Sequence, residues 1–341
     1  MGYKTFPILP TARKSGLPVE DSGQRQVHIN CPFCGDRRRR LYLYTGTDQY
    51  HCFHCGAHGN AVSLYARRTG LSYRDAYHEL LGDSVIHFPR PAVQCPPERG
   101  PAPLDRRDTV YRAMLGLLPL SAAHRDSLLA RGLTDAAIRQ NGYRTLGSGK
   151  ELRDQIAAQL SARFDLNGIP GFFYKLGAWR TCAYSGLLVP VRAADGRVQG
   201  IQIRRDDAER MKYAWMSSAD RPYGTGARSW VHVAGDRSRK EAVITEGPIK
   251  GDVSSFLTEG TLFVCIPGVN AVSFLADALK ELRVSQAWEA FDMDKRCNPP
   301  VQAAVSRLRL EMKKAGVPCR TMAWDPAYKG IDDFLAMKRS A

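Results

Sequence analysis

The sequence predicts an α/β protein of several domains, and three observations carry this prediction. In the last third of the chain, β-type runs alternate with helical runs of roughly 10 to 15 residues, as in a doubly wound parallel sheet. Ahead of it, two alternating runs flank Asp195-Gly196, which is typical of a β-hairpin. Near the N-terminus, two Cys-x-x-Cys pairs are separated by 17 residues, as in a small metal-bound domain.

The predicted domains follow one another along the 341 residues, a length sufficient for about two or three buried cores. Residues 1–85 form the cysteine-containing domain and residues 86–104 a proline-rich linker. Residues 105–165 are a helical segment, residues 166–235 a basic α+β subdomain, and residues 236–341 the parallel-sheet domain.

The first half is predicted to be mainly helical outside the cysteine pairs. The apolar spacing of residues 60–81 fits two helices broken at Gly70, and leucines recur at helical spacing over residues 105–164. The prolines between residues 89 and 103 exclude a helix or central strand there, so this stretch is read as a semi-extended linker.

The second half begins with the hairpin of residues 186–192 and 198–204. The alternation that follows predicts these strands and helices in chain order: strand 242–245, helix 249–258, strand 261–266, helix 271–282, strand 287–291, helix 301–315 and strand 317–324.

The formal net charge of +15 is the sign expected of a protein that meets a polyanion. The first 235 residues carry 33 basic and 20 acidic side chains, whereas the rest carry 16 and 14. No apolar run approaches the roughly 18 residues of a membrane span, and the N-terminus lacks the apolar core of a signal peptide. A cytoplasmic location is therefore expected.

The cysteine pairs, Cys31 with Cys34 and Cys52 with Cys55, match a structural zinc ribbon that binds one Zn²⁺ through four thiolates. Such a ribbon could also do no more than hold its own fold. Between the pairs, Arg37 to Arg40 precede the alternating Tyr42 and Tyr44. Arginines beside aromatic rings suit single-stranded nucleic acid, although a charge run can also be a solvated face.

Carboxylates follow two of the predicted parallel strands. Glu246 ends the first strand ahead of Gly247, and Asp292 and Asp294 follow the third, so the three should meet at one edge of the sheet. Asp332 and Asp333 add a pair near the C-terminus. Converging carboxylates need hard cations, so Mg²⁺ or Mn²⁺ is expected, with two ions supporting phosphoryl transfer. Lys250 and Lys295 could steady a triphosphate.

Both groups of residues resemble the DnaG-type bacterial and phage DNA primases. The run from Tyr50 to Asn60 resembles the family's second zinc knuckle, and the Glu-Gly and Asp-x-Asp pair resembles the TOPRIM signature, which topoisomerases and some nucleases share. The segment from Leu188 to Ser217 resembles the basic subdomain ahead of TOPRIM. By that likeness, nucleic acid or nucleotide contacts are assigned to Arg204, Arg205, Lys212 and Tyr213.

Departures from the common family pattern point to one branch of it. Cys34 stands where many members have histidine, Lys250 where they often have an acidic residue, and Gly330-Ile331-Asp332-Asp333 differs from their usual acidic motif. These features resemble a TOPRIM branch found in phage and mobile-element replication proteins.

The resemblance implies a DNA primase, a DNA-directed RNA polymerase of the primosome with Glu246, Asp292 and Asp294 as catalytic residues. Its implied partners are a single-stranded DNA template and ribonucleoside triphosphates, and a separate replicative helicase stays open as a third. Two alternatives also stay open: a TOPRIM-type metal-dependent nuclease, and a non-catalytic module that binds single-stranded DNA.

Overall fold

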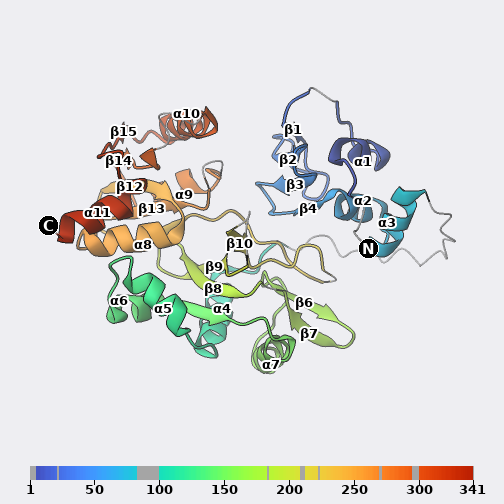
Figure 1. The fold of residues 1–341 in the computed structure, drawn as a ribbon, viewed down its shortest axis with the longest axis horizontal. Helices are drawn as coiled ribbons and strands as arrows, with labels where there is room; N and C mark the ends of the chain where they lie inside the picture. The colour runs from blue at the N-terminus through green and yellow to red at the C-terminus, as the bar shows by residue number, and fades with distance from the viewer. Residues whose placement is uncertain are drawn as a thin grey trace. The chain divides into compact units, whose positions relative to one another are not determined.

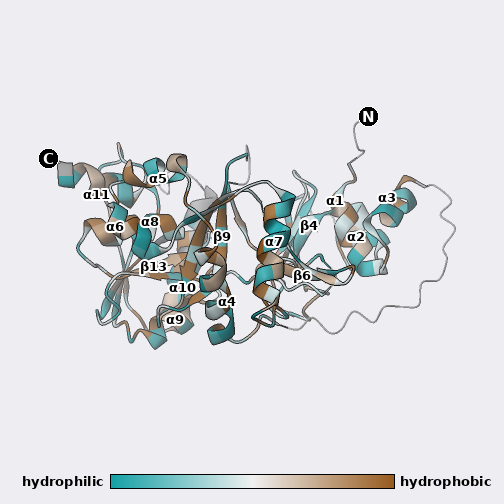
Figure 2. Ribbon diagram, turned by 90° about the horizontal axis from the view of Figure 1, so that it is seen from below, coloured by the Kyte–Doolittle hydropathy of each residue, from teal (hydrophilic) through white to brown (hydrophobic). Residues whose placement is uncertain are grey.

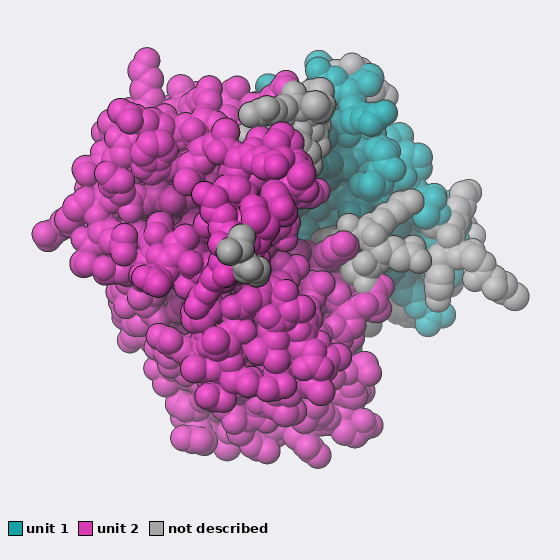
Figure 3. Space-filling view, turned by 60° about the vertical axis from the view of Figure 1, so that its left-hand side comes forward, with its two compact units in different colours: residues 1–102, 166–182, 217–228 teal, residues 103–165, 183–216, 229–341 magenta. Residues whose placement is uncertain are grey.

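The structure is a computed structural model, and it groups the chain into two units (Figure 3). Unit 1 holds the described parts of residues 1–102, 166–182 and 217–228, and unit 2 holds those of residues 103–165, 183–216 and 229–341. The described residues are 5–20, 23–82, 100–182, 184–207, 212–221, 223–268, 271–293 and 299–340. Most of the predicted linker, Asp294 and Lys295 lie outside them.

The two units interleave along the chain, whereas the predicted domains were consecutive segments. Residues 166–182 and 217–228 belong to unit 1, although the prediction placed both in the basic subdomain. Long-range packing decides this grouping, and sequence order carries no signal for it. The functional division into five segments stays a prediction.

Unit 1 contains a four-stranded antiparallel sheet in the order β1-β2-β3-β4. Its strands are β1 (Gln26–Ile29), β2 (Leu41–Tyr44), β3 (Gln49–Cys52) and β4 (His58–Asn60). Alternation along β2 buries Leu41 and Leu43 completely. They share one core with residues of α1 (Ile8–Lys14) and α2 (Ala61–Thr69).

The predicted helix pair is confirmed as α2 and α3 (Tyr73–Leu81). The side chain of Asn60 caps α2 by accepting from the backbone N–H of Ser63, and Gly70 ends the helix with φ of 75°. Unit 1 also holds the hairpin of β6 (Phe172–Lys175) and β7 (Ala178–Thr181).

Unit 2 begins with the predicted helical segment and the predicted hairpin. The helices are α4 (Leu104–Gly116), α5 (Ala122–Leu129), α6 (Asp135–Asn141) and α7 (Lys150–Ser161). The hairpin strands β8 (Gly186–Arg192) and β9 (Val198–Arg205) pair in an antiparallel sheet of order β10-β9-β8-β5. Its edge strands are β5 (Arg144–Leu146) and β10 (Tyr213–Trp215). Figure 2 shows hydrophobic residues along β9, six of whose eight residues are buried.

The C-terminal sheet has the order β11-β13-β12-β14-β15, with β12 to β15 parallel and β11 antiparallel to β13. Helices cover both faces, so the predicted doubly wound sheet is confirmed. Residues of α9 and α10 share one apolar core with the sheet, while α8 and α11 lie together on the other face (Figure 1). The elements are β11 (His232–Ala234), β12 (Glu241–Glu246), α8 (Pro248–Leu257), β13 (Phe263–Ile266), α9 (Leu275–Glu281), β14 (Gln286–Glu289), α10 (Pro299–Lys314), β15 (Cys319–Thr321) and α11 (Ile331–Ser340).

Some predicted elements were wrong in extent. The helix expected over residues 271–282 begins only at Leu275, and the strand expected over residues 317–324 is limited to Cys319–Thr321. The sequence prediction omitted β11 and α11, since three residues are too short for an alternation signal and the acidic pair in the first turn of α11 reads as a loop.

A buried polar network joins the hairpin to the C-terminal sheet. Asp252 of α8 accepts hydrogen bonds from Tyr143 Oη at 2.6 Å and from Arg192 Nη2 at 2.5 Å. His232 Nδ1 accepts from the backbone N–H of Arg192, so its Nε2, 3.0 Å from Asp252 Oδ1, is the donor in that pair. Although burial opposes ionisation, these partners hold the pKa of Asp252 below its ordinary value.

Candidate functional site

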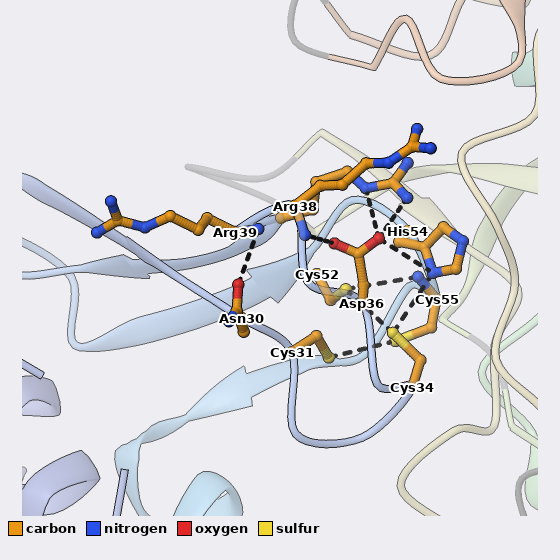
Figure 4. A network of polar contacts seen from close by, with 10 residues as sticks. Asn30, Cys31, Cys34, Asp36, Arg38, Arg39, Cys52, His54 and Cys55 are labelled. Atoms are coloured by element: carbon orange, nitrogen blue, oxygen red, sulfur yellow. Dashed lines mark hydrogen bonds and ion pairs between the residues drawn. The ribbon is translucent and has the colours of Figure 1, made fainter. Parts of the chain in front are cut away.

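The four cysteines lie in two tight turns, each closed by a glycine. Cys31 and Cys34 follow β1. Cys52 is the last residue of β3, and Cys55 lies in the turn that follows it. In the second turn, Gly56 donates its N–H to the carbonyl of Cys52 and has φ of 75°, a conformation that favours glycine. These turns direct all four sulfur atoms to one point (Figure 4).

The geometry of the cluster fits zinc. All four Sγ atoms lie within 4.8 Å of one another. The distances are 3.8 Å between Cys31 and Cys55 and 3.9 Å between Cys34 and Cys52. A regular tetrahedron with Zn–S bonds of about 2.3 Å has edges of roughly 3.8 Å. Since four thiolates fill such a tetrahedron, the site is structural and leaves no open position for catalysis.

Asp36 and His54 surround the cluster, a role that the sequence prediction missed. His54 Nδ1 lies 3.4 Å from Cys34 Sγ and 3.9 Å from a carboxylate oxygen of the buried Asp36 (Figure 4). Arg40 binds Asp36 through two guanidinium nitrogens and holds the pKa of that carboxyl below its usual value. Such neighbours orient metal ligands. Arg40, predicted as a nucleic-acid contact, therefore also has a structural partner.

The outer face of the ribbon sheet is aromatic. The Tyr42 ring lies 3.9 Å from His28 and 4.7 Å from Phe53, measured between centroids, and Tyr44 is the next residue on the same face. His51 extends the row, with its ring 4.4 Å from that of Phe53. Tyr42 and Tyr44 thus belong to one continuous platform, as bases stacking on a sheet would require.

Three of the four predicted arginines beside this platform are exposed: Arg37, Arg38 and Arg39. Arg39 also donates its Nε to the carbonyl of His28 at 3.0 Å. The positive charge therefore lies at the edge of the aromatic face.

In unit 2, the described carboxylates surround a lysine. Glu246 ends β12, Asp292 follows the neighbouring strand β14, and Asp332 and Asp333 begin α11. Lys250 Nζ forms an ion pair with Asp292 and also interacts with Asp332 and Glu246. Burial alone would lower the pKa of Lys250, but these carboxylates outweigh burial and raise it.

These carboxylates are spread more widely than the sulfur atoms. Among the described residues, only the four cysteines form a group of three or more metal-binding side chains with all ligand atoms within 4.8 Å of one another. Burial raises the pKa of Asp332, and Asp333 acts in the same direction. Oxygen donors of this kind suit Mg²⁺ or Mn²⁺.

Arg131, in the helical segment to which the sequence prediction gave no chemistry, also reaches this group. Its Nη1 lies 3.2 Å from Asp332 Oδ2. Tyr213 interacts with both Arg131 and Asp332, and with Arg204, so two predicted contact residues adjoin the acidic group. No sequence signal could have found Arg131, because 201 positions separate it from Asp332.

The other two predicted contacts lie on the same antiparallel sheet. Arg205 lies with its guanidinium 4.2 Å from the ring centre of Tyr184 and forms a 3.3 Å ion pair with Asp207. The backbone N–H of Arg205 donates to the carbonyl of Lys212, whose side chain is exposed.

The fold and the cysteine cluster define a zinc-ribbon protein that also carries a doubly wound α/β sheet. Residues 18–94 match the family model described as the CHC2 zinc finger. Residues 230–341 match a domain of unknown function, DUF3854. Within the described part of the chain, no helix combines the length and apolar character required to cross a membrane.

Parts of the chain are similar in sequence to bacterial DNA primases. The chain is 29% identical over 125 residues to the DNA primase of Escherichia coli K12, and the aligned residues make up 33% of this chain and 21% of that protein. It is 22% identical over 184 residues to the DNA primase of Thermotoga maritima, covering 54% of this chain and 32% of that one. The chain thus spans between about a fifth and a third of the length of these relatives.

Solved primase structures share the fold. The zinc-binding and RNA polymerase domains of the Aquifex aeolicus primase match 97% of this chain and 80% of that one, with a TM-score of 0.52 and 15% identity. A second match is the RNA polymerase domain of the Mycobacterium tuberculosis primase DnaG, in complex with a double-stranded DNA oligomer. The match covers 69% of this chain and 77% of that one, with a TM-score of 0.50 and 19% identity.

Proposed function

We propose that this protein is a DNA primase that makes short RNA primers on single-stranded DNA by metal-dependent nucleotidyl transfer. The observation that carries the proposal is the group of carboxylates around Lys250, at the carboxyl edge of a parallel sheet in a chain that also bears a CHC2 zinc ribbon. The sequence similarity to bacterial primases supports it.

Each part of the chain has a role in this proposal. The aromatic platform and the exposed Arg37 and Arg38 would bind the template strand, with bases on the rings and phosphates on the guanidinium groups. Arg204 and Tyr213, beside the acidic group, would hold the template or the incoming ribonucleotide next to the reacting atoms. Arg205, Lys212 and Lys295 are proposed as further phosphate contacts.

Glu246, Asp292 and Asp294 match the TOPRIM pattern, whereas Asp332 and Asp333 depart from it. We assign two Mg²⁺ or Mn²⁺ ions to these five residues. The ions would neutralise the triphosphate and the attacking oxygen. Glu246, at the end of β12, would accept the proton of the 3′-hydroxyl. Lys250 stays charged at neutral pH because its pKa is raised, so it can pair with a phosphate oxygen.

The test is a priming reaction with unprimed single-stranded DNA, labelled ribonucleotides and Mg²⁺ or Mn²⁺. Replacing Glu246 by Gln should reduce the labelled oligoribonucleotides by about 100-fold or more. Glu281→Gln is the matched control, since Glu281 is an exposed carboxylate at the end of α9.

Three outcomes separate the candidate functions. New RNA that depends on Glu246 supports the primase. Shortened DNA without new RNA would assign the site to a nuclease, and DNA binding without either product would leave only a binding module. Replication of a phage, plasmid or other mobile element is the proposed setting, from the resemblance of Lys250 and the Gly330–Asp333 run to that branch.

A further inference from the structure

A cleft with a volume of about 920 Å³ lies in unit 2, at the opposite end of the C-terminal sheet from the carboxylates. Its lining includes Ala234, the last residue of β11, the residues that follow it up to Arg237, and Gly260, ahead of β13. Because β11 runs antiparallel to β13, this is the edge at which the parallel strands begin. Helix α8 links the two sites: Lys250 lies in its first turn and Ser255 of the cleft in its last. The step from Lys250 to Ser255 spans roughly 7–8 Å along the helix axis.

Most of the charged side chains that line the cleft are cations. The cleft has twice as many arginines as acidic side chains, and one of the acids, Asp252, is already bonded to Arg192, His232 and Tyr143. The lining arginines are Arg112, Arg139, Arg144, Arg192, Arg237 and Arg339.

Most of these arginines have no carboxylate partner. Arg112 pairs with Asp108, and Arg192 with Asp252. In the described part of the chain, the other four guanidinium groups form no ion pair within 4.0 Å. Like charges that line one cleft repel one another, as Arg192 and Arg237 do, and a bound anion would offset this repulsion.

Hydrogen bonds hold Arg144 in place at the cleft, whereas Arg237 has a buried donor left unsatisfied by the described residues. Arg144 donates to the carbonyls of Leu115 and Tyr143 at 3.0 and 2.7 Å, which fixes its guanidinium plane. Arg237 is half-buried, and its Nε is buried with no hydrogen-bond partner among the described residues. Burial lowers the pKa of Arg237, and so does the nearby Arg192. An anion would satisfy both the donor and the charge.

We propose that this cleft is a binding site for an anion that carries two or more phosphate groups. Its volume lies in the range of about 300–1,000 Å³ typical of small-molecule sites. Guanidinium groups bind phosphate oxygens in pairs, which single point charges cannot do. The site is distinct from the proposed catalytic group, so it does not depend on the proposed function.

The test measures binding of inorganic tripolyphosphate to the full chain by calorimetry at low salt, without added divalent cations. The double variant Arg139→Gln/Arg237→Gln should bind at least ten-fold more weakly than the wild type. Arg309→Gln, which removes an exposed arginine of α10, is the charge-matched control and should bind within two-fold of the wild type. All variants keep the zinc cysteines, so any effect of the probe on zinc is common to them.

Two further variants keep the result decisive. Arg139 is exposed, so Arg139→Gln alone is expected to fold and to weaken binding about three-fold, even if the double variant unfolds. Lys250→Gln, in the first turn of α8, measures any binding of the probe to the proposed catalytic group instead of the cleft. Equal loss in Arg309→Gln, or a loss in Lys250→Gln without one in the cleft variants, would overturn the proposal.

Competition then identifies the source of the phosphates. Displacement of tripolyphosphate by a nucleoside triphosphate, but not by an equal phosphate concentration of single-stranded oligonucleotide, assigns the site to a free nucleotide. The reverse order assigns it to the backbone of nucleic acid. If neither competes, the site is specific for inorganic polyphosphate and takes neither a nucleotide nor nucleic acid.

Discussion

At the zinc cluster, individual side chains have separable tasks. The four sulfur atoms supply the tetrahedron, whereas Asp36 holds Arg40 and lies beside His54. The sequence predicted the sulfurs because their spacing is local. It could not predict that Asp36 would be buried beside them, since an isolated aspartate between two knuckles more often faces solvent.

Replacing Cys52 by Ser should weaken zinc retention by more than about 100-fold, because a neutral hydroxyl is a far poorer ligand than a thiolate. The metal content is measured after dialysis against a competing chelator. Cys319→Ser is the matched control: Cys319 is a free cysteine of β15, outside the cluster. Unchanged zinc content in the Cys52 variant would show that Cys52 is not a zinc ligand.

Asp332 gives the acidic group a pH dependence. Burial raises the pKa of its carboxyl above 3.8, so at pH 5 more of it is protonated than of an exposed aspartate. A protonated carboxyl does not bind cations, and Mn²⁺ should therefore bind more weakly at pH 5 than at pH 7. In the absence of metal, the same shift favours folding at low pH, a contribution lost as the pH rises through the raised pKa.

Calorimetric titration with Mn²⁺ at both pH values checks this expectation. Asp332→Asn should lower the affinity for Mn²⁺ at pH 7 and reduce the difference in affinity between pH 5 and pH 7. Asp277 is an exposed residue in the first turn of α9, so Asp277→Asn should retain the affinity for Mn²⁺ and its pH dependence. An Asp332 variant with the wild-type pH dependence would contradict the assignment.

At the scale of elements, α8 is the helix on which the unit 2 sites depend. It carries Lys250 near its start and the buried Asp252 in the next turn, and Gly251 between them lets it approach β13 closely. A β-carbon on Gly251 would lie 2.0 Å from Cys265 Sγ, which is itself buried. A side chain there can fit only if helix and strand move apart.

Gly251→Ala should therefore lower the free energy of unfolding by about 1–3 kcal/mol, although alanine is the better helix former. Gly116→Ala is the matched control. Gly116 is also helical, at the end of α4, and nothing lies within 4 Å of its added β-carbon. That variant should gain up to about 1 kcal/mol. Denaturant unfolding of both proteins measures the difference.

The sequence predicted most elements because their signals are local. The Asp195-Gly196 turn, the break at Gly70 and the alternation of the last third all lie in short windows, and the structure confirms them. The contacts of Arg131 with Asp332, and of Asp252 with Tyr143 and Arg192, join segments more than 50 residues apart. Pairing over such distances has no local pattern, which is why these residues appeared only in the structure.

At the scale of the whole molecule, each unit has its own apolar core. Heating should therefore give two transitions, and removing zinc should lower the temperature of only one of them, because the ligands all lie in unit 1. Differential scanning calorimetry with and without a chelator measures this. A single transition that shifts as a whole would mean that the two units unfold together.

The interleaving of the two units also sets an order of events during synthesis. The ribbon cysteines lie among the first 102 residues, but unit 1 is completed only by residues 217–228. At roughly 5–20 residues per second, the ribosome adds these last pieces about 6–25 s after it has passed residue 102. A nascent ribbon thus has time to capture zinc and form its sheet well before Ala227, whose carbonyl closely approaches Gly56, has been made.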